Sequence, residues 1–72
     1  MPDYPILSGA RIVKTLEDLG FHQTRQKGSH VVMRRGSQGC VVPLHREVKR
    51  GTLAGVIRQA GVSAEDFLGA VR

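Results

Sequence analysis

His30 is the residue of this chain best placed for chemistry, at the end of the segment Lys27-Gly28-Ser29-His30. Imidazole gains and loses a proton near neutral pH, so it can act both as an acid and as a base. Gly28-Ser29 is typical of a turn, and the β-branched residues Val31-Val32 that follow favour a strand. The segment therefore predicts a proton-transfer group at the start of a strand, with an ammonium group close by. A histidine that is only a surface or half-buried residue of its strand is the alternative interpretation.

A second segment runs from Val41-Val42-Pro43-Leu44-His45 to Lys49-Arg50-Gly51-Thr52-Leu53. Its first part predicts the end of a strand, because proline cannot donate to the sheet ladder. His45 could be a second acid or base, a substrate contact or a structural residue, and the sequence leaves these open. Gly51 or Thr52 is expected to cap the helix that follows, whose free N-terminal amides would attract phosphate.

Positive charge is concentrated in the middle of the chain. The 72 residues carry a net charge of +5, but residues 25–50 hold seven basic side chains and one acidic side chain. The rest of the chain is slightly acidic. A basic segment that also holds two histidines favours a polyanionic partner, and nucleic acid is the commonest one. A basic surface that is simply solvated is the alternative.

RNA can be cleaved without a metal ion when a base lies near the 2′-hydroxyl, an acid near the 5′-oxygen and positive charge near the phosphate. His30 is the catalytic candidate. Arg34 shares its strand face if the imidazole points out of the sheet, because residues four apart in a strand lie on the same side. The residues expected to contact RNA are Lys27, Ser29, Arg34, His45, Arg46, Lys49 and Arg50.

Two other functions fit the same residues. A non-catalytic double-stranded RNA-binding module would use the cations and would not need His30. A protein-interaction domain would dock an acidic partner on the basic segment, and its complex would form without RNA. Formation of product from RNA in the presence of a chelator distinguishes a nuclease from both.

Several classes of site are disfavoured. The single cysteine, Cys40, cannot form a disulfide within the chain, and three scattered histidines with one thiol lack the spacing of a metal centre. No phosphate-binding loop or dinucleotide fingerprint is present, so neither a metal nor a cofactor is expected. No apolar run reaches membrane-spanning length, and the N-terminus lacks a signal-peptide pattern. These features predict a cytoplasmic protein.

Three strands are predicted in the centre of the chain. They cover residues 21–26, 30–35 and 40–44, and residues 27–29 and 36–39 form the turns between them. Consecutive strands joined by tight turns form an antiparallel meander. The sequence therefore predicts a three-stranded antiparallel sheet.

Helices are predicted on both sides of this meander. The first begins after the N-cap Ser8 and ends before Gly20, and the second runs from Thr52 to Gly61. A short third helix follows Ser63, which opens a capping box. Two amphipathic helices can cover one face of the sheet, so the expected fold class is α+β, in one domain over residues 1–72. The other sheet face is then open to solvent or a partner.

With these segments in place, the sequence resembles the HicA family, the toxin half of HicA–HicB toxin–antitoxin pairs, from about Ile6 to Phe67. The segments that carry the resemblance are Leu16-Glu17-Asp18-Leu19-Gly20-Phe21, Lys27-Gly28-Ser29-His30, Val41-Val42-Pro43-Leu44-His45, Lys49-Arg50-Gly51-Thr52-Leu53 and Ile57-Arg58-Gln59-Ala60-Gly61-Val62-Ser63.

The resemblance implies a fold like the double-stranded RNA-binding domain, with α-β-β-β-α order, and the activity of an mRNA interferase that stops translation by cutting RNA. The catalytic histidine of the family falls in the Gly-Ser-His motif, hence His30. A HicB-like antitoxin that covers this site is the implied protein partner. The chain departs from the family at Gly55, inside the predicted second helix, where glycine costs up to about 1 kcal/mol relative to alanine.

Overall fold

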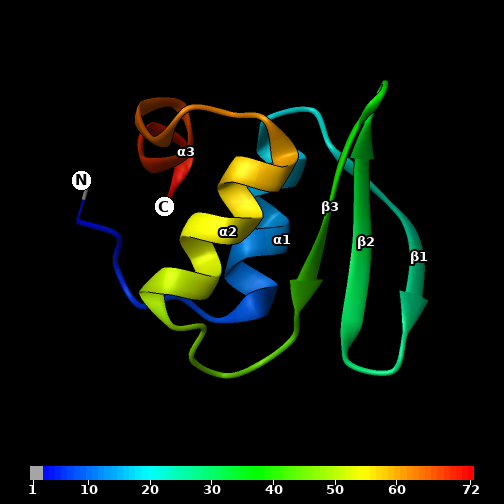
Figure 1. Ribbon diagram of the computed structural model, residues 1–72, viewed down its shortest axis with the longest axis horizontal. Helices are drawn as coiled ribbons and strands as arrows, with labels where there is room; N and C mark the ends of the chain where they lie inside the picture. Colours follow the sequence, from blue (N-terminus) through cyan, green and yellow to red (C-terminus); the bar gives the residue numbers. More distant parts are fainter. Residues whose placement is uncertain (1–2) are drawn as a thin grey trace.

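A computed structural model describes residues 3–72, and its elements follow the predicted order (Figure 1). The helices and strands are α1 (Gly9–Asp18), β1 (His22–Lys27), β2 (His30–Arg35), β3 (Gln38–Pro43), α2 (Arg50–Ala60) and α3 (Ala64–Ala70). The three strands form one antiparallel sheet in the order β1-β2-β3. The α+β class and the α-β-β-β-α order with an additional short helix are confirmed.

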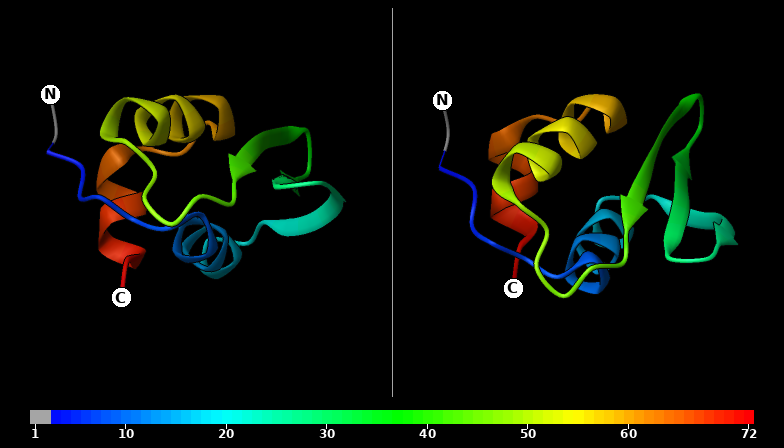
Figure 2. Two further views of the ribbon diagram at one scale, coloured as in Figure 1. Left: turned by 90° about the horizontal axis from the view of Figure 1, so that it is seen from below. Right: turned by 60° about the horizontal axis from the view of Figure 1, so that its bottom comes forward.

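The helices lie on one side of the sheet, as expected. Val31 and Met33 of β2 and Cys40 and Val42 of β3 point toward them and are buried in one core with the apolar faces of α1 and α2. Helix α2 packs on β3, whereas all six residues of β1 are exposed. Figure 2 shows the β1–β2 hairpin projecting past the helices. Both faces of β1 are therefore accessible, whereas β2 is exposed mainly on the face away from the helices.

Two short hairpin turns connect the strands, and both are shorter than predicted, since β1 extends through Lys27, which was expected in the first turn. Gly28-Ser29 and Gly36-Ser37 each have a glycine at positive φ (58° and 60°) followed by a residue at negative φ. This is the pattern of a type II′ turn, which joins strands with two residues. The predicted loop over residues 36–39 and the strand start at Cys40 are therefore wrong, since β3 already begins at Gln38.

A bulge in β1 decides which side chains share a face. Gln23 pairs with Met33 and Arg25 pairs with Val32, so Thr24 is an extra residue in the ladder. Strict alternation from Gln23 would place Arg25 on the same side as Gln23. The bulge instead turns Arg25 to the side away from the helices, because cross-strand partners share a face.

Capping follows the prediction for two of the three helices. The Ser8 hydroxyl accepts a hydrogen bond from the Arg11 amide, and the Ser63 hydroxyl accepts one from Asp66. For α2, the expected caps Gly51 and Thr52 are wrong. The N-cap is Lys49, which makes no side-chain capping bond, and Gly51 and Thr52 lie inside the first turn.

Arg35 has a structural role that its charge did not suggest. Its guanidinium donates to the carbonyl of Leu19 (2.7 Å) and to the Gln38 side chain, and it lies 4.7 Å from the centre of the Phe21 ring. Gln38 in turn donates to the carbonyl of Gly61. These contacts join the ends of α1 and α2 to the sheet, so Arg35 belongs to the scaffold.

Replacement of Gly55 by alanine is expected to stabilise the protein by roughly 0.5–1 kcal/mol, because alanine is the better helix former. An added Cβ would meet only the Arg58 guanidinium, at 3.9 Å. Thermal unfolding followed by circular dichroism measures the effect. Gly61→Ala is the contrasting variant: Gly61 has φ +75°, so alanine there should destabilise. A lower melting temperature for Gly55→Ala would contradict the prediction.

Stability is expected to fall as the pH rises from about 9 to 11, because burial raises the pKa of the Cys40 thiol from 9.0 to about 11. In this window the unfolded chain has lost the thiol proton while the folded chain retains it, so rising pH favours unfolding by an amount on the order of 2 kcal/mol. Urea unfolding at pH 8, 9, 10 and 11 tests this. Cys40→Ala should show a shallower decline, and identical declines would contradict the assignment.

Candidate functional site

His30 is the first residue of β2 and lies on the sheet face opposite to the helices. Its side chain is exposed, whereas the next residue, Val31, is 2% exposed and points into the core. Among the described residues, no hydrogen bond is made by the imidazole of His30. The ring is therefore available to a ligand.

Two cations of β1 lie on the same face as His30. Lys27 is its direct cross-strand partner, so the Cβ atoms are about 5 Å apart. Arg25 pairs with Val32, two residues further along the same face. We call Arg25, Lys27, His30 and Arg34 the basic sheet face. No carboxylate from the three strands interrupts it, because β1, β2 and β3 contain no acidic residue.

Arg34 stands at the far end of this face. It shares the face with His30, as expected if the imidazole points outward, but lies four residues away, or about 13 Å along the strand. Its side chain extends over Gly39 of β3, where an added Cβ would lie 3.2 Å from Nη1. Its cross-strand partner on β1 is the exposed His22. Arg34 can therefore contact a different group of a ligand from the one that lies at His30.

The turn at Ser29 is joined to the connection between β3 and α2. The Leu44 amide donates to the Ser29 carbonyl at 2.6 Å, which brings the segment around His45 beside the hairpin. This connection is fixed at two further points: His45 accepts from the Gly9 amide (2.8 Å), and Val48 donates to Leu7 (2.7 Å). The exposed side chains of the connection therefore extend from an anchored backbone.

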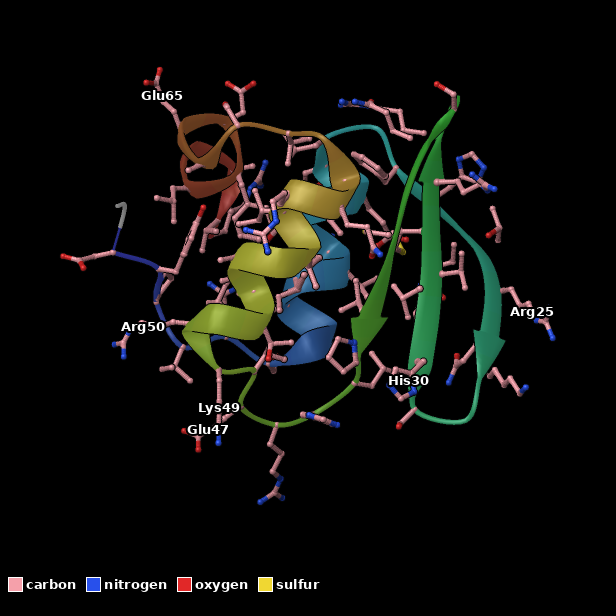
Figure 3. The ribbon with its side chains drawn as sticks, viewed as in Figure 1. Arg25, His30, Glu47, Lys49, Arg50 and Glu65 are labelled. Carbon is pink, nitrogen blue, oxygen red and sulfur yellow. The ribbon has the colours of Figure 1, made fainter. Side chains whose placement is uncertain are left out.

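The remaining candidates are spread along this connection and the start of α2. His45, Arg46 and Lys49 are exposed. Figure 3 shows Lys49 and Glu47 at the end of the molecule where His30 also lies, while Arg50 points away on the far side of α2. The Nε of Arg50 donates to the carbonyl of Tyr4 at 2.6 Å. Arg50 thus points away from the end of the molecule where the imidazole lies.

Arg25 is a member of the basic sheet face that sequence reasoning did not single out. It was counted only as part of the basic segment. Its place beside Lys27 follows from strand alternation, because the two residues are two apart and the bulge at Thr24 lies before both of them. The pair was missed because the predicted first strand ends at residue 26 and leaves Lys27 in the turn, whereas β1 extends through Lys27.

The arrangement has the elements of acid–base chemistry on an anion: an exposed imidazole, a neighbouring ammonium and guanidinium groups along the same surface. Within residues 3–72, no cluster of three or more metal-ligating side chains is found. No helix of the described chain is long and apolar enough to span a membrane.

Comparison with known families identifies one family whose model matches the chain. The family model for the HicA toxin of bacterial toxin–antitoxin systems matches residues 9–62, which include α1, the whole sheet and α2. No curated protein matches the chain significantly. Because the family model covers most of the chain, the protein belongs to the HicA toxin family of bacterial toxin–antitoxin systems.

Proposed function

We propose that this protein is an endoribonuclease toxin, an mRNA interferase, that cleaves RNA without a metal ion and uses His30 as its acid–base group. The observation that carries the proposal is the exposed imidazole of His30 directly opposite Lys27 on a sheet face without carboxylates. Membership of a toxin family supports it.

The proposed reaction is the internal transesterification of RNA. The 2′-oxygen attacks the adjacent phosphorus and loses its proton, the bond from phosphorus to the 5′-oxygen breaks, and the 5′-oxygen takes up a proton. His30 performs one of these proton transfers, and water exchanges the other proton. Lys27 stabilises the charge that develops on the phosphate. The products are a 2′,3′-cyclic phosphate and a 5′-hydroxyl.

The other candidates hold the RNA backbone on either side of the cleaved bond. Ser29 is next to the imidazole, and His45 and Arg46 extend from the anchored connection beside it. Arg34, about 13 Å from His30 along β2, contacts a neighbouring phosphate. Lys49 and Arg50 contact the RNA backbone further away from the cleaved bond. Only the Nε of Arg50 is bonded to Tyr4, so its terminal nitrogens can still donate to a phosphate.

The implied protein partner is an antitoxin, and we propose that a HicB-like protein covers the basic sheet face. Val41 is 41% exposed, and Val32 is its cross-strand partner on the same face. An apolar centre with charged residues around it is the usual anatomy of a protein interface. An acidic antitoxin surface would complement the cations and exclude RNA.

The test is incubation of the purified full chain with a defined RNA in excess EDTA. We expect cleavage with 2′,3′-cyclic phosphate ends, detected by the resistance of the 3′-ends to ligation until the cyclic phosphate is removed. RNA binding without any product would instead support the double-stranded RNA-binding module. Cleavage that EDTA abolishes would contradict the metal-independent mechanism.

A further inference from the structure

A concave feature lies behind the basic sheet face, between α1 and the β1–β2 hairpin. It is a groove of about 280 Å³. Val13 of α1, Val31 of β2 and Leu44 form its apolar surface. It exists because β1 extends past the helices, so that the helix-facing side of the hairpin is left partly uncovered. The groove lies on the sheet face opposite to His30.

Two glutamine amides from β1, Gln23 and Gln26, line this groove. Residues three apart in a regular strand point to opposite faces. The bulge at Thr24 removes this difference, because Gln23 pairs with Met33 and Gln26 pairs with Val31, both of which face the helices. The bulge therefore places both amides in the groove, while Arg25 faces the opposite side together with Lys27.

The groove begins close to the proposed reaction centre. Gln26 precedes Lys27, and Val31 follows His30, so the groove and the basic sheet face are the two sides of one projecting hairpin. At the end of the hairpin they are separated by the small turn Gly28-Ser29, whose Ser29 carbonyl accepts from the Leu44 amide. A strand of RNA with a phosphate at His30 can pass around this turn and place a nearby base in the groove.

We propose that this groove binds one unpaired nucleobase of the RNA and prefers adenine. This inference rests on the proposed function in that RNA is the ligand. The volume is just below the roughly 300–1,000 Å³ typical of sites for drug-sized molecules, which suits a single small flat group. Unstacked bases of single-stranded RNA are commonly read at their edges by protein side chains.

Amide chemistry gives the preference. A glutamine side chain offers a donor and an acceptor side by side, which match the N7 acceptor and the N6 amino donor of adenine. Gln26 uses one amide hydrogen on the Gly28 carbonyl (3.1 Å), which holds the side chain and leaves its oxygen as an acceptor. Lys14 and Glu17 of α1 both line the groove, so their charges offset each other and the recognition of the base rests on the two amides.

The experiment measures base preference without requiring cleavage. The full wild-type chain is titrated with two 2′-O-methyl pentaribonucleotides, all-uridine and uridine with a central adenosine, which lack the 2′-hydroxyl nucleophile. We expect the adenosine oligonucleotide to bind about 10-fold more tightly, as one bidentate base contact would give. The side-chain amide signals of Gln23 and Gln26 should shift in its nuclear magnetic resonance spectrum.

Two variants separate the groove from general RNA binding. Gln23→Ala/Gln26→Ala should reduce the preference to less than about 2-fold while the affinity for the uridine oligonucleotide stays the same. Gln59→Ala is the matched control, since Gln59 is an exposed glutamine that bonds to the Val41 amide outside the groove. It should keep the preference.

The outcomes distinguish this inference from the proposed function. Equal affinity for both oligonucleotides, or a preference that survives in the double variant, would overturn the groove assignment even if the wild type cleaves RNA. A preference that the double variant loses supports the groove. If that result came with no cleavage of unmodified RNA in EDTA, the nuclease proposal alone would fall.

Discussion

Replacement of His30 by alanine is expected to lower the rate of RNA cleavage by about 10²–10⁴-fold, the usual contribution of a positioned acid or base. The imidazole is exposed on the sheet surface, so its removal leaves no cavity in the core. The variant should therefore fold like the wild type and keep its affinity for RNA. Cleavage rates in EDTA, RNA affinity and thermal unfolding, measured on the same preparations, test these three expectations. Growth arrest on expression should disappear together with cleavage.

His22→Ala is the matched control for this experiment. His22 is also exposed on a strand, but its cross-strand partner is Arg34 at the opposite end of the basic sheet face. We expect its cleavage rate to stay within about 3-fold of wild type, since it makes no proton transfer. If the two variants lost activity equally, or if His30→Ala still cleaved RNA and arrested growth, the catalytic assignment of His30 would be wrong.

Replacement of Gly9 by alanine is expected to destabilise the fold by about 3 kcal/mol or more, at or above the upper end of ordinary overpacking. An added Cβ would overlap the carbonyl oxygen of Pro43 and would lie 2.7 Å from Cα of Leu44. Both are backbone atoms, so neither can rotate away. The overlap would also separate the Gly9 amide from the His45 carbonyl, the bond that anchors the connection beside the hairpin.

A loss of this size matters for so small a domain, whose total stability is roughly 4–11 kcal/mol. Urea unfolding of the variant measures it. Gly51→Ala is the control, because Gly51 lies in the first turn of α2 and an added Cβ there meets nothing within 4 Å. Stability of Gly9→Ala within 1 kcal/mol of wild type would show that α1 can shift away from β3 at little cost.

Local signals in the sequence were sufficient for the elements of this fold. Apolar residues at helical spacing and a serine that caps the first turn define both α1 and α3. These signals lie within a few residues of one another in the sequence. The Gly28-Ser29 turn likewise fixed the start of β2 and hence the position of His30. The prediction is wrong at residues 36–39, where glycines at both ends favour a four-residue loop. The structure has a two-residue turn with Gly36 at positive φ, and β3 begins at Gln38.

Charge was a weaker guide to individual residues. The basic segment predicted an anion-binding surface, yet its members have different roles. Arg35 joins α1 and α2 to the sheet, and Arg50 bonds to the backbone of Tyr4, whereas Arg25 stands on the basic sheet face. Composition alone does not distinguish these guanidinium groups. Their hydrogen-bond partners in the folded chain show which arginines are structural and which are free to bind a ligand.

The sequence by itself therefore determined the order of the elements, the exposed turn before His30 and the basic character of the surface around it. The tertiary structure decided which side chains meet. One extra residue at Thr24 sets the faces of β1, and the contact of Gly9 with Pro43 joins segments far apart in the chain. The physical reason is that periodicity and capping are encoded within a few residues. The register of strand pairing and the close approach of backbones depend instead on atoms that only the folded chain brings together.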